Sequence, residues 1–486
     1  MKRSLTALTL ACLLLLPCAL ADANPPDDFV QMTVPLLFTD YIPADVDKIN
    51  AAVNEITRDA IGCEINLVPL LYFTSNNVNY RRQAELNYLA KDGLTLDLFN
   101  YFVGSGQAMP MENLLEQYGQ GILNSLDIPL SLYRESDGHI YKLPFVNRAA
   151  MAVGVVMRTD ILERHHIDVS GIYSWADLDE LFAHLLALEP ELALICGHST
   201  SQALNNHVLR SVSVQNTYFC LSPDDPDTLM YVFETDAYRE EISYARKWYE
   251  AGYTLDDMAI QTVYAQSLVK AGRLFAYFQY CNPASAQEES ARCGMPMTVI
   301  PLSRPILSPT AAYTYCWSIS AGCAHPDKAM QFLNLLSTDA RLVNLMLNGI
   351  EGEHYVLLPD GTIDDPPGAD TLGYANAHVW QFPNPSIGYL RADSVSFKQA
   401  RFDFYQSAEI SPLLGFFFDD SAVWAEQQAV NQVIDQYYYG LGTGQLDPAV
   451  YLPRMLSQMD SAGAEKVREE IQRQYAEWRA SKEEQP

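Results

Sequence analysis

The sequence predicts an α/β protein of more than one domain, each built on a mostly parallel sheet flanked by helices. Strand and helix patterns alternate from residue 31 to residue 102, an order typical of a parallel sheet. The chain has 486 residues, more than one hydrophobic core usually supports. Its composition, 49% hydrophobic and 19% charged, is that of a folded protein.

The amino-terminal elements form a strand–helix–strand–helix–strand unit. Asp45 opens the first helix and Gly62 ends it, with apolar residues at helical spacing between them. Ligands of such sheets bind beyond the carboxyl ends of the strands, which makes the residues after each strand candidate site residues. The expected strands are 31–38, 63–72 and 94–102, and the expected helices are 43–62 and 80–90.

A second strand-rich block begins after Pro144. Ser174 and Asp177 have the spacing of a capping box, and Asp447 followed by Pro448 predicts another helix start. The expected strands are 149–157, 193–196, 272–280, 297–301 and 313–319, and the expected helices are 174–188, 237–251, 329–346, 423–439 and 467–478.

Residues 1–21 are interpreted as an export signal. Lys2 and Arg3 precede an apolar run at 5–16 that is too short to span a bilayer, and a small-x-small cleavage site ends at Ala21. We expect simple cleavage there. Lipidation at Cys18 is the alternative, although a proline precedes this cysteine where a small residue is usual.

The charge balance excludes two classes of partner. The 60 acidic side chains against 31 Lys and Arg give a net charge of −29, which repels nucleic acids and anionic membranes.

No cysteine or histidine spacing fits a zinc site, and the glycines at 440, 442 and 444 lack the strand and helix start that flank a dinucleotide-binding loop. We therefore expect no metal and no cofactor.

The number of cysteines limits how many disulfide bonds the chain can form. Seven of them follow the export signal, an odd number that leaves at least one thiol unpaired within the chain. Buried free thiols are favoured, while Cys281 with Cys293 and Cys316 with Cys323 are close enough in sequence to form bridges.

Short motifs follow one another in a fixed order along the chain. They are Gly138-x-x-Tyr141-x-Leu143-Pro144, Arg158-Thr159-Asp160, Ser174-Trp175-x-Asp177-Leu178, Trp317-x-Ile319 with His325-Pro326-x-Lys328-Ala329, Asn348-Gly349-Ile350-Glu351-Gly352, Leu414-Gly415-Phe416 and Gln474-x-x-x-Trp478.

In this order the motifs resemble those of family 1 extracellular solute-binding proteins, the receptors of ABC importers for sugars and related solutes. The resemblance implies a type II periplasmic-binding-protein-like fold, in which two lobes are joined by hinge segments and close on a solute. It places 22–145 with 272–308 in the first lobe, and 146–271 with 309–486 in the second, which ends in a helical extension.

The resemblance also implies a role. The expected protein is a monomer that is exported to the cell surface or periplasm, or anchored there by lipid. It is not an enzyme; it captures a carbohydrate or similar polar solute and delivers it to the transmembrane subunits of an ABC permease.

The candidate ligand contacts share two properties: they stand at strand ends, at the hinge or in a covering loop, and they suit a sugar. Aromatic rings stack on the C–H faces of sugars, and polar side chains bond their hydroxyl rims. Arg148 would also suit a carboxylate or phosphate. The candidates are Asp40, Tyr41, Tyr101, Asn147, Arg148, His198, Tyr280, Trp317 and Trp380.

Two other classes of function stay open at this point. A secreted glycoside-active enzyme needs a carboxylate pair, and acidic residues are too abundant to exclude one, although GxSxG and HExxH motifs are absent. A solute sensor that presents its ligand to a signalling receptor would have the same sequence features.

Overall fold

In the computed structural model, the amino-terminal unit forms as its apolar pattern predicts. β1 (Val30–Phe38) pairs in parallel with β2 (Cys63–Leu71), and α1 (Val46–Ile61) connects them. Gly62 ends α1 in the left-handed conformation, with a φ of 63°, so that its N–H reaches the last helical carbonyls.

The structure describes residues 29–483 except 39–40, 72–81, 83–84, 87–88, 90–93, 99–102, 104, 127–128, 136, 145–149, 197–212, 215–216, 257, 259–262, 310–311, 313–314, 369–372, 377–380 and 392–394.

A second sheet completes the first lobe. β12 (Tyr315–Ile319) lies between β3 (Leu94–Leu98) and β4 (Leu143–Pro144) and is antiparallel to both. The buried side chains of this lobe form one core that runs from Met32 to Leu143 and continues from Trp317 to Phe382. The helices around it are α1, α4 (Glu112–Tyr118), α5 (Gln120–Ser125), α13 (Pro326–Thr338) and α14 (Ala340–Asn348).

The second lobe has a larger sheet in the order β15-β11-β5-β9-β6, with β10 also paired to β5. Its core includes the apolar residues of the central strands and of helix α7, which Ser174 and Asp177 start with the expected capping box. The elements are β5 (Ala150–Arg158), β6 (Ala193–Cys196), β9 (Leu274–Cys281), β10 (Met297–Pro301), β11 (Ile306–Leu307), β15 (Glu409–Ile410), α6 (Thr159–Arg164), α7 (Trp175–Leu188), α10 (Ala265–Lys270) and α11 (Ser285–Cys293).

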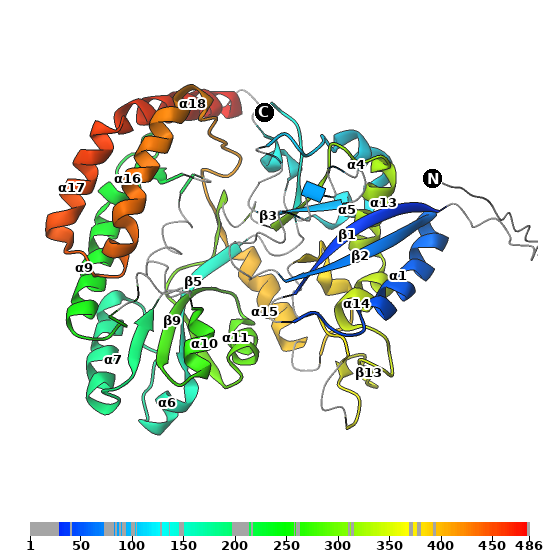
Figure 1. The fold of residues 1–486 in the computed structure, drawn as a ribbon, viewed down its shortest axis with the longest axis horizontal. Helices are drawn as coiled ribbons and strands as arrows, with labels where there is room; N and C mark the ends of the chain where they lie inside the picture. The colour runs from blue at the N-terminus through cyan, green and yellow to red at the C-terminus, as the bar shows by residue number, and fades with distance from the viewer. Residues whose placement is uncertain are drawn as a thin grey trace, which may run out of the picture.

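The carboxyl-terminal helices extend the second lobe, as expected. α16 (Trp424–Gly442), α17 (Pro448–Ser461) and α18 (Ala464–Glu483) pack with α9 (Asp236–Glu250) around a separate core (Figure 1). Asp447 caps α17 by accepting the N–H of Ala449. The remaining elements are β7 (Phe219–Leu221), β8 (Leu229–Tyr231), β13 (Val356–Leu357), β14 (Ile363–Asp364), α15 (Val395–Gln406) and short 3-10 turns at Leu130–Tyr133, Val232–Glu234, Pro385–Ile387 and Ser421–Val423.

Strand pairing corrects the lobe boundaries expected from the sequence. The assignment of 272–308 to the first lobe is wrong, because β9 pairs with β5 and β6, and the core of the second lobe contains Leu274 to Phe278. The assignment of all of 309–486 to the second lobe is also wrong. β12 pairs with β3 and β4, and the core of the first lobe extends to Phe382. The expected boundary near 145 agrees with the step from β4 to β5.

Two local expectations also change. The described sheets are mixed rather than mostly parallel: β5 is antiparallel to β9, β10 and β11, while β6 is parallel to β9. The single helix expected over 329–346 is two helices. Asp339 separates them because its carboxylate accepts the N–H groups of Arg341 and Leu342, which starts α14.

The described elements pass from one lobe to the other three times: after β4, after β11 and through α15, which lies between the lobes in Figure 1. A small apolar cluster packs beside these crossings, with Tyr133 and Cys316 from the first lobe and Leu307 and Leu414 from the second. Lys142 is fully buried next to it. Its ammonium pairs with Glu135 at 2.7 Å and lies 4.8 Å from the centre of the Phe417 ring. The described side chains beside the crossings are therefore closely packed.

Glu241 on α9 is a buried carboxyl group, and its environment yields a test of how α9 packs with the carboxyl-terminal helices. It is 5% exposed, and its Oε2 has no hydrogen-bond partner among the described residues. Burial, with a smaller contribution from the charge of Glu240, raises the pKa of Glu241 well above its usual value. The folded protein therefore holds a proton that the unfolded chain releases above about pH 4.5. Folding stability is lost as pH rises from there towards the folded-state pKa.

We predict that Glu241→Gln stabilises the protein by about 1 kcal/mol or more at pH 7.5. The gain should shrink towards zero near pH 4, where wild-type Glu241 is protonated in both states. Urea unfolding at several pH values measures this difference. Glu240→Gln, which removes the same charge from an exposed neighbour, is the matched control and should show little change. Equal pH profiles for the two variants would contradict the prediction.

Candidate functional site

The first-lobe side of the candidate site is organised by the side chain of Gln381, which is 1% exposed. Its amide bonds the backbone of Leu37 in both directions: Oε1 accepts the Leu37 N–H at 2.9 Å, and Nε2 donates to the Leu37 carbonyl at 3.0 Å. Leu37 lies at the carboxyl end of β1, on the edge that β2 does not occupy. The Gln381 side chain thus completes the hydrogen bonding of β1 as an additional strand residue would.

The backbone of Gln381 holds a second element of the site. The indole N–H of Trp317 on β12 donates to the Gln381 carbonyl at 2.9 Å. Gln381 Nε2 also approaches Asn376 Oδ1 at 3.2 Å, and Phe38 packs edge-on against Tyr374, with ring centres 6.3 Å apart. Leu37 near the end of β1, Trp317 in β12 and Gln381 are therefore held together.

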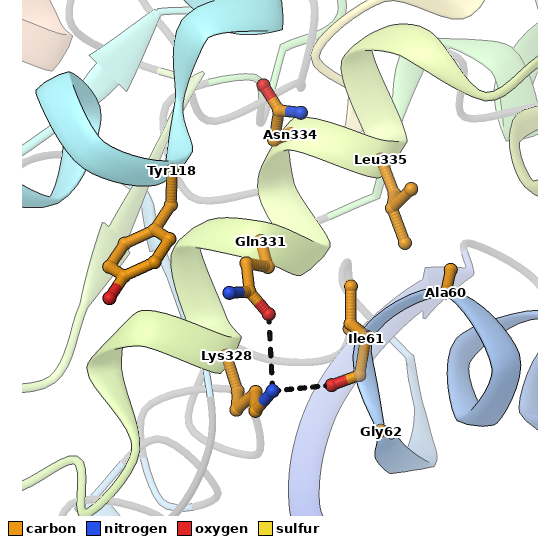
Figure 2. A pocket seen from close by; sticks show the side chains of 8 residues that line it. All are labelled: Ala60, Ile61, Gly62, Tyr118, Lys328, Gln331, Asn334 and Leu335. Carbon is orange, nitrogen blue, oxygen red and sulfur yellow. Dashed lines mark hydrogen bonds between the residues drawn. The ribbon is translucent and has the colours of Figure 1, made fainter.

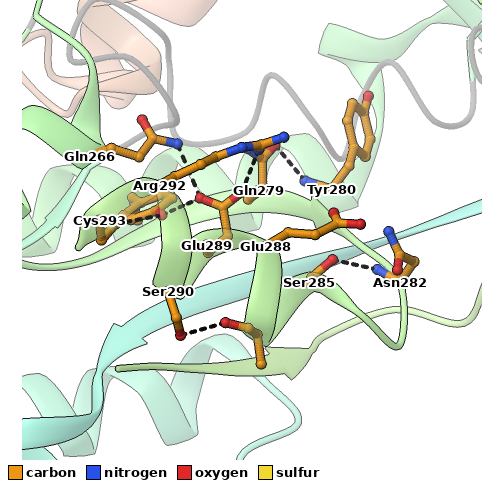
Figure 3. Close-up of polar contacts among 12 residues, drawn as sticks. Gln266, Gln279, Tyr280, Asn282, Ser285, Glu288, Glu289, Ser290, Arg292 and Cys293 are labelled. Atoms are coloured by element: carbon orange, nitrogen blue, oxygen red, sulfur yellow. Dashed lines mark hydrogen bonds and ion pairs between the residues drawn. The ribbon is translucent and has the colours of Figure 1, made fainter. Parts of the chain in front are cut away.

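Three of the candidate ligand residues lie within the described part of the chain. Tyr41 is 62% exposed between β1 and α1. Tyr280 is half-buried at the carboxyl end of β9 in the other lobe, where its N–H donates to Gln279 Oε1 (Figure 3). Trp317 is 3% exposed and belongs to the core of the first lobe. Its burial and bonded indole N–H give it a packing role in this conformation, and its contact with ligand stays a prediction.

The other candidates lie outside the described residues, and for them the assignment stays a prediction. They are Asp40, Tyr101, Asn147, Arg148, His198 and Trp380. Gln381, by contrast, was not among the candidates. It stands next to Trp380 in the sequence, but no local pattern shows that its amide reaches a strand more than 340 residues away.

A pocket of about 540 Å³ lies apart from this site, between the end of α1 and α13 (Figure 2). Its one charged group, Lys328, donates to the Ile61 carbonyl at 2.7 Å and approaches Gln331 Oε1 at 3.4 Å. A lysine in this position donates a hydrogen bond to a carbonyl of the last turn of α1. Its positive charge also interacts favourably with the negative, carboxyl-terminal end of the helix dipole. The pocket is thus built around a helix cap.

One cluster of described side chains has the atoms of a metal site: Asp45, Glu353 and His354 place their ligand atoms within 4.8 Å of one another. Lys48 already supplies a cation, because its ammonium pairs with Glu353 and lies 3.2 Å from Asp45 Oδ1. His354 Nδ1 accepts the Ile350 N–H at 2.9 Å, which leaves the ring proton on Nε2, where it is donated to Asp45 at 3.2 Å. A metal would have to displace that proton.

The contacts of this cluster favour a structural ion-pair network. The bonds from His354, and next those from Lys48, lower the pKa of Asp45 and keep its carboxylate charged. The network joins the start of α1 to the turn that follows α14. Its donor atoms are engaged by Lys48, by the Ile350 N–H and by one another.

With the geometry in place, comparison with known proteins identifies the fold. The chain has TM-score 0.78 with the N-glycan transport solute binding protein NgtS of Streptococcus pneumoniae in complex with Man1GlcNAc, at 20% identity over 92% of this chain and 99% of that chain. It has TM-score 0.59 with an HMO-binding, ABC-transporter-associated solute binding protein of Bifidobacterium longum infantis, at 14% identity over 92% and 99% of the two chains. The chain therefore has the two-lobed fold of solute-binding proteins.

Similarity at the sequence level points in the same direction. A carbohydrate ABC transporter substrate-binding protein of Streptococcus pneumoniae serotype 4 is 24% identical over 461 residues, which cover 90% of this chain and 89% of that protein. Residues 412–480 match the family described as domain of unknown function DUF3502. They correspond to the segment after β15 and the helices α16 to α18.

The importance of Gln381 can be tested through stability. We predict that Gln381→Leu lowers the free energy of unfolding by about 2 to 3 kcal/mol, because the buried N–H and carbonyl of Leu37 lose their partners. Urea unfolding measures the loss. Gln436→Leu on α16, where the exposed glutamine only bonds a carbonyl of its own helix, is the control and should cost much less. A similar cost for both variants would show that Gln381 does not organise the end of β1.

Proposed function

We propose that this protein is the solute-binding receptor of an ABC importer and binds an oligosaccharide between its two lobes. The observation that carries the proposal is the two-lobed fold, shared over more than nine-tenths of the chain with solute-binding proteins named for glycans. The 24% identical relative is named as a carbohydrate ABC transporter substrate-binding protein. Delivery to permease transmembrane subunits and export by the 1–21 signal belong to the same proposal.

Capture in this proposal works by lobe closure. Ligand that touches both lobes at once stabilises the closed arrangement and shifts the population towards it. The end of β1 with its Gln381 support provides one wall, and the end of β9 around Tyr280 provides the other. The packed hinge cluster gives the lobes a defined pivot. Among the described residues, no helix is both long and apolar enough to cross a membrane.

The chemistry of a receptor is binding without turnover. A glycan bound in the cleft should leave unchanged, since transport requires the intact solute. The competing proposal of a glycoside-active enzyme would require two carboxylates placed about 5 to 10 Å apart on opposite sides of a glycosidic bond.

We predict that saccharides raise the melting temperature of the purified protein. A ligand at 100 times its Kd that binds only the native state adds about 2.7 kcal/mol of stability. The panel is Man1GlcNAc, Man5GlcNAc, kestose and, as the non-carbohydrate arm, trialanine. Chromatography of the saccharides after overnight incubation checks that they are intact. A shift with trialanine alone would refute the carbohydrate assignment, and cleaved saccharide would refute the receptor role.

A further inference from the structure

We propose that the pocket between the end of α1 and α13 binds a small organic carboxylate, with Lys328 and Gln331 as its contact residues. The pocket belongs to the first lobe and uses none of the candidate saccharide contacts, so this inference goes beyond the proposed function. Its volume of about 540 Å³ lies within the usual range of ligand pockets. The polar side chains that line it, Tyr118, Lys328, Gln331 and Asn334, are all half-buried (Figure 2).

The first observation is the charge of Lys328. Its ammonium donates to the Ile61 carbonyl at 2.7 Å and approaches Gln331 Oε1 at 3.4 Å, and both of these oxygens are neutral. Elsewhere in the same lobe, Lys48 and Arg341 pair with carboxylates. Within the described part of the chain no carboxylate pairs with Lys328. Because an ammonium has three N–H donors, one donor and a positive charge without a carboxylate partner remain for a ligand.

The second observation is the orientation of two amide groups. Gln331 Oε1 faces the Lys328 ammonium, and Asn334 Oδ1 accepts the Ile122 N–H at 3.2 Å. With both oxygens engaged, each side chain has its NH₂ group left to bond a ligand. Figure 2 shows the Gln331 nitrogen on the side of Tyr118, whose hydroxyl can also donate. The polar groups of this pocket are therefore mainly hydrogen-bond donors.

Close packing of α5 on α13 holds one of these amides in place. A Cβ added at Gly121 on α5 would lie 2.7 Å from Asn334 Oδ1 and would also collide with the Thr338 side chain. Glycine at this position lets the α5 backbone approach α13 closely enough for the Ile122 N–H to reach Asn334. The donor of Asn334 is thus oriented before a ligand arrives, which lowers the cost of binding.

A carboxylate on an apolar body suits this set of groups. Its oxygens accept hydrogen bonds and donate none, whereas sugar hydroxyls need acceptors as well as donors. Hydrogen bonds between ionised partners are roughly twice as strong as neutral ones. Ile61 and Leu335 supply apolar lining for the rest of the ligand. The net charge of −29 repels an anion from a distance, but salt screens this repulsion beyond about 8 Å, so Lys328 dominates within the pocket.

The test is a ligand-observed NMR titration of the purified protein with benzoate, and with benzamide as a neutral probe of the same shape. We expect benzoate to bind with a Kd of about 1 mM or lower, and benzamide to bind roughly tenfold more weakly. Lys328→Met should lose benzoate binding. Because this variant also removes the donor to the Ile61 carbonyl, its melting temperature is measured in parallel.

Gln331→Glu separates a binding role from a structural one. It keeps an oxygen for Lys328 but replaces the NH₂ donor with a negative charge. We expect a melting temperature at least equal to that of wild type, and benzoate affinity lower by roughly tenfold or more. Gln436→Glu adds the same charge to an exposed glutamine on α16 and should bind benzoate as wild type does. Saccharide binding should be the same in both glutamine variants.

Three results would overturn the inference. The first is no binding of benzoate to wild type at about 10 mM, a concentration that would reveal even a weak site. The second is benzoate affinity within about twofold of wild type in Gln331→Glu, which would place the bound anion elsewhere. The third is equal affinity for benzamide, which would show that the charge of the ligand is not recognised. None of these results bears on saccharide capture, so the proposed function is judged separately.

Discussion

The described elements pass between the lobes three times, and this constraint shapes the rest of the molecule. The strands next to these crossings, β5, β11 and β15, are neighbours in one sheet of the second lobe. A rotation of one lobe must bend all three connections together. The side chains beside them, with buried Lys142 between Glu135 and the Phe417 ring, resist independent movement of any one connection.

The crossings also explain why the lobes have separate cores. The described residues of 30–144 and 315–391 form the first lobe around one set of buried side chains, and β5, β6, β9 and β10 of the second lobe pack around another. Hinge motion leaves both intact, because dense packing moves as a rigid body more easily than it deforms. The third core, formed by the carboxyl-terminal helices and α9, adds mass to the second lobe only.

Electrostatics in this acidic protein are mostly local. The net charge of −29 is large, yet many of the 31 basic side chains pair with nearby carboxylates, among them Arg401 with Glu288 and Lys48 with Asp45 and Glu353. Most such pairs are exposed and add little to folding stability.

The sequence by itself determined the element types and the class of fold. Periodicity and caps placed β1, α1, β6, α7 and the carboxyl-terminal helices, since these signals are local. The lobe assignment of 272–308 and of β12 was decided only by tertiary structure, because an apolar strand reads the same whichever sheet it joins. The same holds for Gln381 and Trp317: no local pattern shows that the Gln381 amide completes a distant strand, or that the Trp317 indole packs in a core.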